Sequence, residues 1–290
     1  MTDMATRNLS MQKPGQHRAT GILLVAFFAV LSVIILMPFA SIVLTSLKDS
    51  GLVIRNGFNL KIDLNSLTLA NYKYLFTGPH QYFRWFGNSI LLTVVQTVLT
   101  LFVSAWVAYG FALYDFKGKN FLFVCVLIVM MIPFEILMLP MYREIVAMKL
   151  VNNYLGIMLP YLAHPIAIFF FRQYLRSIPK EIVDAGRIDG CSEYGIFIRL
   201  ILPLMKPAFA AMAIFIGMTS WNNYLWPLLV LSDSKMFTLP IGLSSLMSPY
   251  GNNYTLLISG AVMSVIPIVV LFFSAQRFFI EGMSTGSVKG

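Results

Sequence analysis

The stretch PKEIVDAGRIDGCSEYGIFIRLILPLMKP, residues 179–207, is the one long charged segment in an otherwise apolar chain. Its charged residues are Lys180, Glu181, Asp184, Arg187, Asp189, Glu193, Arg199 and Lys206. Apolar runs long enough to cross a lipid bilayer flank it on both sides. A loop that only joined two membrane spans would not need so many charges, so the sequence predicts a docking surface for a soluble partner here.

The rest of the chain has the composition of an integral membrane protein. Hydrophobic residues make up 58% of the 290 residues and charged residues only 11%, whereas soluble domains contain roughly 25% charged residues. The net charge of +9 does not indicate nucleic-acid binding, because the basic residues lie in loops between apolar runs. Cys125, Cys191 and three scattered histidines show no metal-ligand spacing, so we expect no metal site and no cofactor.

The apolar runs predict the fold class. A bilayer core about 30 Å thick requires about 20 apolar residues per helix. Six segments meet this requirement: 21–46, 88–113, 120–142, 154–172, 203–231 and 255–280. Because backbone groups cannot stay unpaired in lipid and no barrel-type alternation is present, we expect an all-α integral membrane protein. Its six transmembrane helices form one domain over residues 1–290, and the first run is too long for a signal-peptide core.

The loops predict the orientation. Most of the 21 Lys and Arg residues fall on one side of the membrane if the N-terminus is cytoplasmic. Short cytoplasmic loops are enriched in these residues, so we expect both termini and the charged loop on the cytoplasmic side of the plasma (inner) membrane. The long external segment 47–87 is rich in Tyr, Phe and Trp. These side chains either brace the spans in short interfacial helices or contact a substrate, and both interpretations stay open.

Glu135 is the first candidate residue for a transport pathway. It lies in an apolar segment between Pro133 and Pro140, and a carboxylate at that depth is costly unless it is paired, protonated or hydrated. The two prolines remove helix hydrogen bonds and allow the segment to bend. Glu135 either lines a pathway or binds a freed backbone amide or a partner helix, and the sequence does not separate these hypotheses.

The second candidate set is Trp221, Asn222 and Asn223 in the fifth span. Two adjacent Asn side chains in a membrane must hydrogen-bond to other helices or to water. An aromatic side chain beside them can stack on a sugar ring. An interfacial aromatic belt explains the Trp but not the Asn pair, so we interpret the set as pathway lining.

The charged loop itself predicts two short helices. Ser177 is a possible cap, Pro179 suits the first turn, and Gly190 suits the end of the first helix. Ser192 is positioned to cap a second helix that runs to residues 202–203. The first helix is short and partly acidic, and we expect it to lie across the cytoplasmic end of the fourth and fifth spans.

The loop resembles the EAA loop in the membrane subunits of binding-protein-dependent ABC importers. That pattern is E-A-A, three residues, G, nine residues, I, one residue, and L-P. The matching residues here are Ala185, Gly190, Leu202 and Pro203, and the replacements are Asp184 for Glu, Gly186 for Ala and Leu200 for Ile. Gly weakens a helix by roughly 0.5–1 kcal/mol relative to Ala, so Gly186 is expected to loosen the loop helix.

The resemblance extends over nearly the whole chain. The carbohydrate-uptake branch, which includes the maltose permeases, is similar at residues 187–190, 221–223, 226–227, 276–278 and 286–290. The arabino-oligosaccharide permease subunits are similar, more narrowly, at residues 114–119, 236–245 and 248–254.

The resemblance implies a type I importer fold and a set of partners. These are a second membrane permease subunit in a heterodimer, two cytoplasmic ATP-binding subunits, an extracytoplasmic sugar-binding protein and the lipid bilayer. It also implies contacts with the ATP-binding subunits through Glu181, Asp184, Ala185, Gly186, Asp189 and Gly190 in the loop, and through Gly286, Lys289 and Gly290 in the tail. The external loop 232–254 is expected to reach the binding protein.

The chain has no P-loop motif and no nucleophile–base arrangement, so we expect no catalytic residues and ATP hydrolysis on a separate subunit. The favoured function is therefore the transmembrane subunit of an ATP-driven sugar or oligosaccharide importer. The alternative is an ion-coupled secondary transporter of a small polar solute. Such a protein is expected to have internal repeats and ionisable residues on broken midplane helices; only Glu135 fits, and no clear repeat is present.

Overall fold

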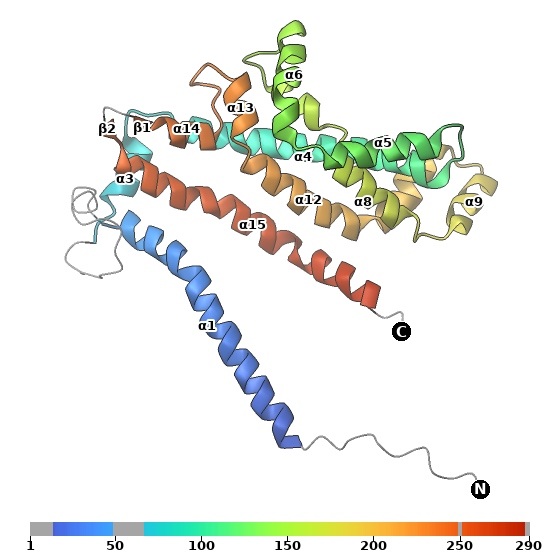
Figure 1. The fold of residues 1–290 in the computed structure, drawn as a ribbon, viewed down its shortest axis with the longest axis horizontal. Helices are drawn as coiled ribbons and strands as arrows, with labels where there is room; N and C mark the ends of the chain where they lie inside the picture. Colours follow the sequence, from blue (N-terminus) through green and yellow to red (C-terminus); the bar gives the residue numbers. More distant parts are fainter. Residues whose placement is uncertain (1–13, 49–66, 249–250, 288–290) are drawn as a thin grey trace. The chain divides into compact units, whose positions relative to one another are not determined.

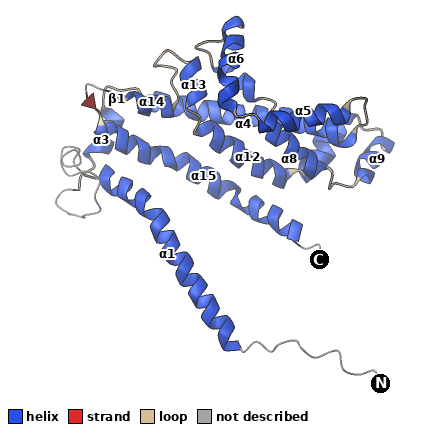
Figure 2. Ribbon diagram, in the orientation of Figure 1, coloured by secondary structure: helices blue, strands red, loops and turns tan. Residues whose placement is uncertain are grey.

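The computed structural model describes residues 14–48, 67–248 and 251–287. Their regular secondary structure is helical apart from one pair of two-residue strands, as predicted for an all-α fold (Figures 1 and 2). They fall into two compact units, Met1–Thr77 with Tyr254–Val262, and Gly78–Asn253 with Met263–Gly290.

The first unit holds α1 (Pro14–Ser46), α3 (Ala70–Thr77) and the first turns of α15 (Tyr254–Ser287). From residue 21 onward α1 is apolar on all sides and almost fully exposed, which is typical of a helix surrounded by lipid. Its carboxyl end is held by Asn71, whose Nδ2 donates to the carbonyl oxygens of Ser46 and Lys48 at 2.7 Å each. The short helix α3 agrees with the bracing interpretation of segment 47–87, of which residues 49–66 lie outside the described part.

The second unit is built around α4 (Tyr82–Leu113). Along this helix pack α8 (Pro165–Leu175) and α12 (Lys206–Trp221), as Figure 1 shows. The core between them contains the fully buried Ala105, Ala108 and Phe171. Small residues on α4 let the neighbouring helices approach closely, so α4 is the central helix of the second unit.

Three of the predicted spans are broken helices. The pair α5 (Lys119–Met131) and α6 (Phe134–Ala147) bends by 107°. The helix α7 (Tyr154–Met158), continued by the 3-10 turn η2 (Leu159–Tyr161), meets α8 at 43°. The helices α10 (Glu193–Ile196) and α11 (Leu202–Leu204), joined by the π-turn η3 (Phe197–Ile201), meet α12 at 79°.

Prolines explain where the breaks fall. Pro133, Pro165 and Pro207 stand at or just before the first turn of the second helix of each pair. Proline suits that position and disfavours helix in the residue before it. Pro140 lies inside α6 without ending it, so only one of the two prolines beside Glu135 causes the expected bend.

The breaks also correct the predicted span boundaries. Within the described residues, 21–46, 82–113 and 254–274 are long and apolar enough to cross a membrane alone, and the count reaches six if each bent pair is one span. The fifth span does not continue to residue 231. It ends at Trp221, and a separate helix, α13 (Leu225–Val230), follows after the Asn pair.

The predicted external loop 232–254 lies on the amino end of α4. It contains α14 (Leu239–Ser245) and the antiparallel strands β1 (Met247–Ser248) and β2 (Gly251–Asn252). Trp85 Nε1 donates to the carbonyl of Ser234 at 2.9 Å, and Ser89 Oγ accepts from the backbone N–H of Leu239 at 2.7 Å. A side chain at Gly242 would overlap the indole of Trp85, so glycine is required for this close contact.

Candidate functional site

The charged loop forms the predicted helix, α9 (Lys180–Ile188). Its N-cap residue is Pro179, and Ser177 is not a cap because its hydroxyl donates to the carbonyl of Tyr174 at 2.7 Å. The capping role expected of Ser177 is therefore wrong. Glu181 lies in the first turn, where a carboxylate interacts favourably with the helix dipole.

The carboxyl end of α9 stops at Gly190, as predicted. Gly190 has a φ of 75°, a left-handed conformation that favours glycine. Its N–H donates to the carbonyl of Arg187 at 3.1 Å, and the N–H of Cys191 donates to the carbonyl of Gly186 at 3.0 Å. This pair of bonds is a Schellman motif, which satisfies carbonyls left open at the helix end.

Gly186 has a packing role that local helix propensity does not reveal. Only Val183 and Gly186 are buried in α9. A Cβ on Gly186 would lie 2.8 Å from Leu200 Cδ1 and 3.1 Å from Ile196 Cγ1. The missing side chain therefore lets α9 lie directly on α10 and η3, and the expected cost of Gly186 is offset by this close packing.

The outer face of α9 is exposed and mixes acidic with apolar side chains. Glu181, Asp184, Ala185, Asp189 and Gly190 are all exposed. The neighbouring Ile188 is 87% exposed and Tyr194 is 68% exposed. We call this face, formed by Glu181, Asp184, Ala185 and residues 188–190 together with Tyr194, the α9 surface. Ile188 and Tyr194 thus add apolar area to an otherwise charged face.

Glu193 fixes α9 to the end of α4. Its Oε1 accepts from Nε of Arg187 at 2.7 Å, and its Oε2 accepts from the hydroxyls of Tyr114 and Tyr109. The hydrogen bond from Arg187, followed by that from Tyr114, holds the pKa of Glu193 below its ordinary value. The carboxylate of Glu193 therefore stays ionised at neutral pH. Its hydrogen bonds weaken only in acid, when Glu193 takes up a proton.

The sequence did not point to Glu193 as the centre of a network. It follows the cap Ser192, whose side chain accepts from the N–H of Gly195 at 3.2 Å as predicted. Tyr114, however, is 79 residues away in the chain, and no local spacing indicates that contact. Arg187 Nη1 also lies 3.3 Å from Asp184 Oδ1 on the exposed side.

A second candidate site is a cavity of about 680 Å³ beside the break between α5 and α6. It brings together Glu135, Asn222 and Asn223, as the pathway interpretation requires, and its other polar residues include His164, Thr219 and Tyr224. Asn223 Nδ2 donates to the hydroxyl of Tyr161 at 3.2 Å, and Asn222 Nδ2 donates to the carbonyl of Met218 at 2.9 Å. Glu135 is exposed in the first turn of α6.

Trp221 does not line this cavity. It is buried, its ring packs edge-on against Phe86 with ring centres 5.7 Å apart, and its indole N–H donates to the carbonyl of Ser264 at 3.2 Å. The helix α12 ends at Trp221, so the two Asn residues leave the helix while Trp221 keeps its helical packing. The structure thus separates Trp221 from the Asn pair.

The predicted tail contact is only partly within the described residues. Gly286 is near the end of α15, whereas Lys289 and Gly290 lie outside the described residues. Within the described residues, no group of three or more His, Cys, Asp or Glu side chains is placed to hold a metal ion.

The chain is similar to known transport proteins. Residues 101–284 match the family described as binding-protein-dependent transport system inner membrane component. The chain is 51% identical over 269 residues to the arabinooligosaccharides transport system permease protein AraQ of Bacillus subtilis (strain 168), covering 93% of this chain and 96% of that protein. It is 38% identical over 204 residues to the lactose transport system permease protein LacG of Rhizobium radiobacter, covering 70% of this chain and 74% of that protein.

The fold is also similar to that of solved transporter structures. One of them is the crystal structure of a bacterial ABC transporter involved in the import of the acidic polysaccharide alginate, with a TM-score of 0.80. The match covers 96% of this chain and 100% of the other chain at 20% sequence identity.

The close packing at Gly186 generates a testable prediction. The variant Gly186→Ala is expected to lower the unfolding temperature of the protein in detergent, because overpacking costs about 1–3 kcal/mol. In a Leu200→Ala background the same substitution should cost less than in the wild type, because the new methyl group then has room. Gly195→Ala, whose Cβ would meet only Ser192 Oγ at 3.3 Å, is the matched control. An unchanged unfolding temperature for Gly186→Ala would contradict the packing role.

Proposed function

The chain belongs to the family of inner membrane components of binding-protein-dependent transport systems, and we propose that it imports arabinose-containing oligosaccharides as one of two membrane subunits. The 51% identity to an arabinooligosaccharide permease over nearly all of both chains carries this proposal. ATP hydrolysis takes place on a separate subunit in this family. Family membership also removes the ion-coupled secondary transporter from consideration.

In this proposal the α9 surface docks on a cytoplasmic ATP-binding subunit. Two such subunits serve the complex, one for each membrane subunit. The exposed carboxylates of Glu181, Asp184 and Asp189 suit a basic groove, and the exposed Ile188 supplies an apolar anchor. Movement of α9 would pass to α10 and η3 through the contact at Gly186, and to α4 through Glu193.

The opposite end of the second unit suits an extracytoplasmic sugar-binding protein. Residues 232–254 are fixed to α4 by the hydrogen bonds of Trp85 and Ser89, so a partner docked on them would act directly on that central helix. This assignment places both termini in the cytoplasm. The second membrane subunit is a different protein, and Gly286, Lys289 and Gly290 of the tail contact the ATP-binding subunits.

The cavity beside α6 is the proposed sugar pathway. Sugar hydroxyls need hydrogen-bonding groups that replace water, and amide and carboxylate side chains provide them. Glu135, Asn222 and Asn223 supply such groups, and Phe134 and Tyr161 add stacked rings with centres 5.1 Å apart. Trp221 is left out of the pathway because it packs elsewhere.

The substrate and the energy source can be tested in one transport assay. Cells that carry the whole transporter should take up labelled arabino-oligosaccharide, and deletion of this chain should abolish that uptake. Collapse of the proton gradient with ATP held constant should leave uptake unchanged, because the energy comes from ATP. Uptake that stops with the gradient, or normal uptake without this chain, would contradict the proposal.

The docking of α9 predicts a specific loss of coupling. Asp184→Lys should lower uptake about tenfold or more, because a like charge in a docked interface costs several kcal/mol. Gly190→Val should also lower uptake, because a β-branched residue does not tolerate a φ of 75°. Membrane insertion, measured by the amount of chain in membrane fractions, should be unchanged.

Matched controls separate docking from folding. Asp184→Asn removes only an exposed ion pair, worth about 0–1 kcal/mol, and Gly190→Asn tolerates the left-handed conformation. Both should retain most of the uptake. Normal uptake in Asp184→Lys and Gly190→Val would disprove the assignment of α9 as the coupling helix.

The pathway role of Glu135 has its own test. Glu135→Gln should reduce uptake about tenfold, because hydrogen bonds to a charged group contribute about 1.5–3 kcal/mol. Glu144→Gln, on the same helix but not lining the cavity, is the control and should transport normally. If Glu135→Gln leaves both uptake and assembly of the complex unchanged, Glu135 does not take part in transport.

A further inference from the structure

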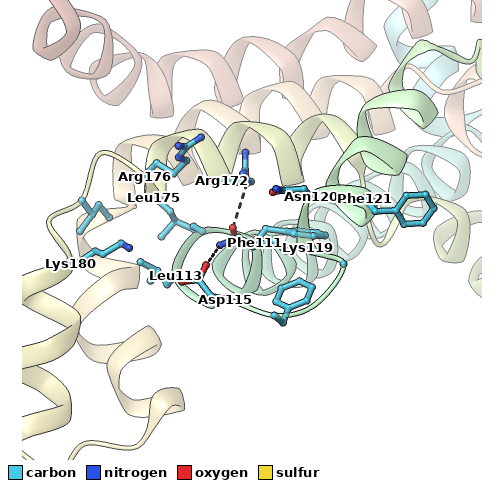
Figure 3. A pocket seen from close by; sticks show the side chains of 14 residues that line it. Phe111, Leu113, Asp115, Lys119, Asn120, Phe121, Arg172, Leu175, Arg176 and Lys180 are labelled. Atoms are coloured by element: carbon cyan, nitrogen blue, oxygen red, sulfur yellow. Dashed lines mark hydrogen bonds and ion pairs between the residues drawn. The ribbon is translucent and has the colours of Figure 1, made fainter.

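A second cavity, of about 650 Å³, belongs to neither the α9 surface nor the proposed sugar pathway. It lies at the end of the second unit that carries α9, between the carboxyl end of α4, the first turn of α5, the carboxyl end of α8 and the start of α9 (Figure 3). Its charged lining residues are Asp115, Lys119, Arg172, Arg176 and Lys180. Four cations and one carboxylate therefore share a single cavity.

The positive charge of this cavity is only partly neutralised. Lys119 Nζ lies 3.0 Å from Asp115 Oδ1 and donates to the carbonyl of Tyr114 at 2.7 Å. Arg172 and Arg176 stand one turn apart, on the same face at the end of α8. Neither arginine has an ion pair with an acidic side chain in the described part of the chain. Two adjacent guanidinium groups without a counter-charge favour an anion between or beside them.

Arg172 is held in place by its surroundings. Its guanidinium lies 3.7 Å from the centre of the Phe123 ring, and its Nε is 3.5 Å from the carbonyl oxygen of Phe111. This leaves the Nη groups of the fork available at the cavity. A pre-oriented arginine loses little entropy on binding and suits the oxygens of a phosphate. The first turn of α5, residues 119–121, lines the same cavity and adds the positive end of a helix dipole.

The edge of the cavity is apolar. Phe121 lines it and is 71% exposed, and Phe116 also lines it and is exposed. Figure 3 shows Phe121 well apart from the cationic side chains. Leu122 and Val124 continue the exposed apolar surface along α5, which is the first half of a broken span. The cationic group thus adjoins a surface suited to hydrocarbon, and this combination fits an amphiphile better than a soluble anion.

We propose that this cavity binds the headgroup phosphate of an anionic phospholipid, with the acyl chains along α5. Basic pockets at the ends of membrane helices are suited to such headgroups, because the anionic lipid surface and the cations lie at the same depth. The bound lipid contacts α5, α8 and Lys180 of α9 together. It therefore stabilises the end of the bundle on which α9 lies.

The proposal is tested by measuring which lipid stays bound to the full-length protein, purified in detergent and analysed by native mass spectrometry. Phosphatidylglycerol and phosphatidylcholine are offered at equal concentration. We expect preferential retention of phosphatidylglycerol, and we expect the variant Arg176→Gln to weaken it about fivefold, as for the loss of one cation near a lipid surface. The double variant Arg176→Gln/Lys180→Gln should weaken it further.

A control variant and a competition with inorganic phosphate complete the test. Arg199→Gln removes an exposed cation at the same end of the unit but outside the cavity, and it should retain the lipid as the wild type does. Equal retention of the two lipids by the wild type, or unchanged retention in the double variant, overturns the proposal. Displacement of phosphatidylglycerol by millimolar inorganic phosphate also overturns it, because the site would then take a soluble anion.

Discussion

The carboxylate of Glu193 is the contact on which the arrangement of α9 depends. It accepts hydrogen bonds from Arg187 of α9 and from Tyr109 and Tyr114 at the end of α4. An exposed ion pair alone contributes about 0–1 kcal/mol, but a carboxylate with several donors is held in one position. The close contact of Gly186 with Leu200 and Ile196 also holds α9 against α10 and η3. These contacts tie the position of α9 to α10, η3 and the end of α4.

The broken spans must satisfy a second constraint, the pairing of backbone N–H and C=O groups in the membrane. In a bilayer, non-helical backbone is tolerated only where protein or water satisfies it. The end of α12 meets this condition because Asn222 donates to the carbonyl of Met218 and Asn223 reaches Tyr161. The break between α5 and α6 places Glu135 in a first helical turn, where the dipole stabilises a carboxylate. Both breaks lie beside one cavity, which Glu135, Asn222 and Asn223 line together.

Much of the fold was predictable because apolar length and proline position are local properties. The apolar segments become helices, three of them as bent pairs, and the stop at Gly190 and the cap at Ser192 are as predicted. Long-range packing was not predictable. Pro133 ends a helix whereas Pro140 does not, and Trp221 packs against Phe86 instead of lining the cavity with its two Asn neighbours. Glu193 finds Tyr114 only in the folded chain, and Gly186 appeared to be a weakness because its partner Leu200 is in another helix.

The short length of α9 makes its stability depend on contacts with the rest of the protein. A helix of nine residues is too short to be stable alone in water, and this one buries only Val183 and Gly186. Its stability must come from the Schellman motif at Gly190, the contact with Leu200 and the bonds to Glu193. Relative to the E-A-A pattern, Gly replaces Ala at 186 and Leu replaces Ile at 200, and these two positions are in contact. Leucine and isoleucine have the same volume but branch at different carbons, and Leu200 Cδ1 would lie only 2.8 Å from a Cβ at residue 186. Glycine at 186 therefore fits the shape of leucine at 200, and this fit keeps α9 in place.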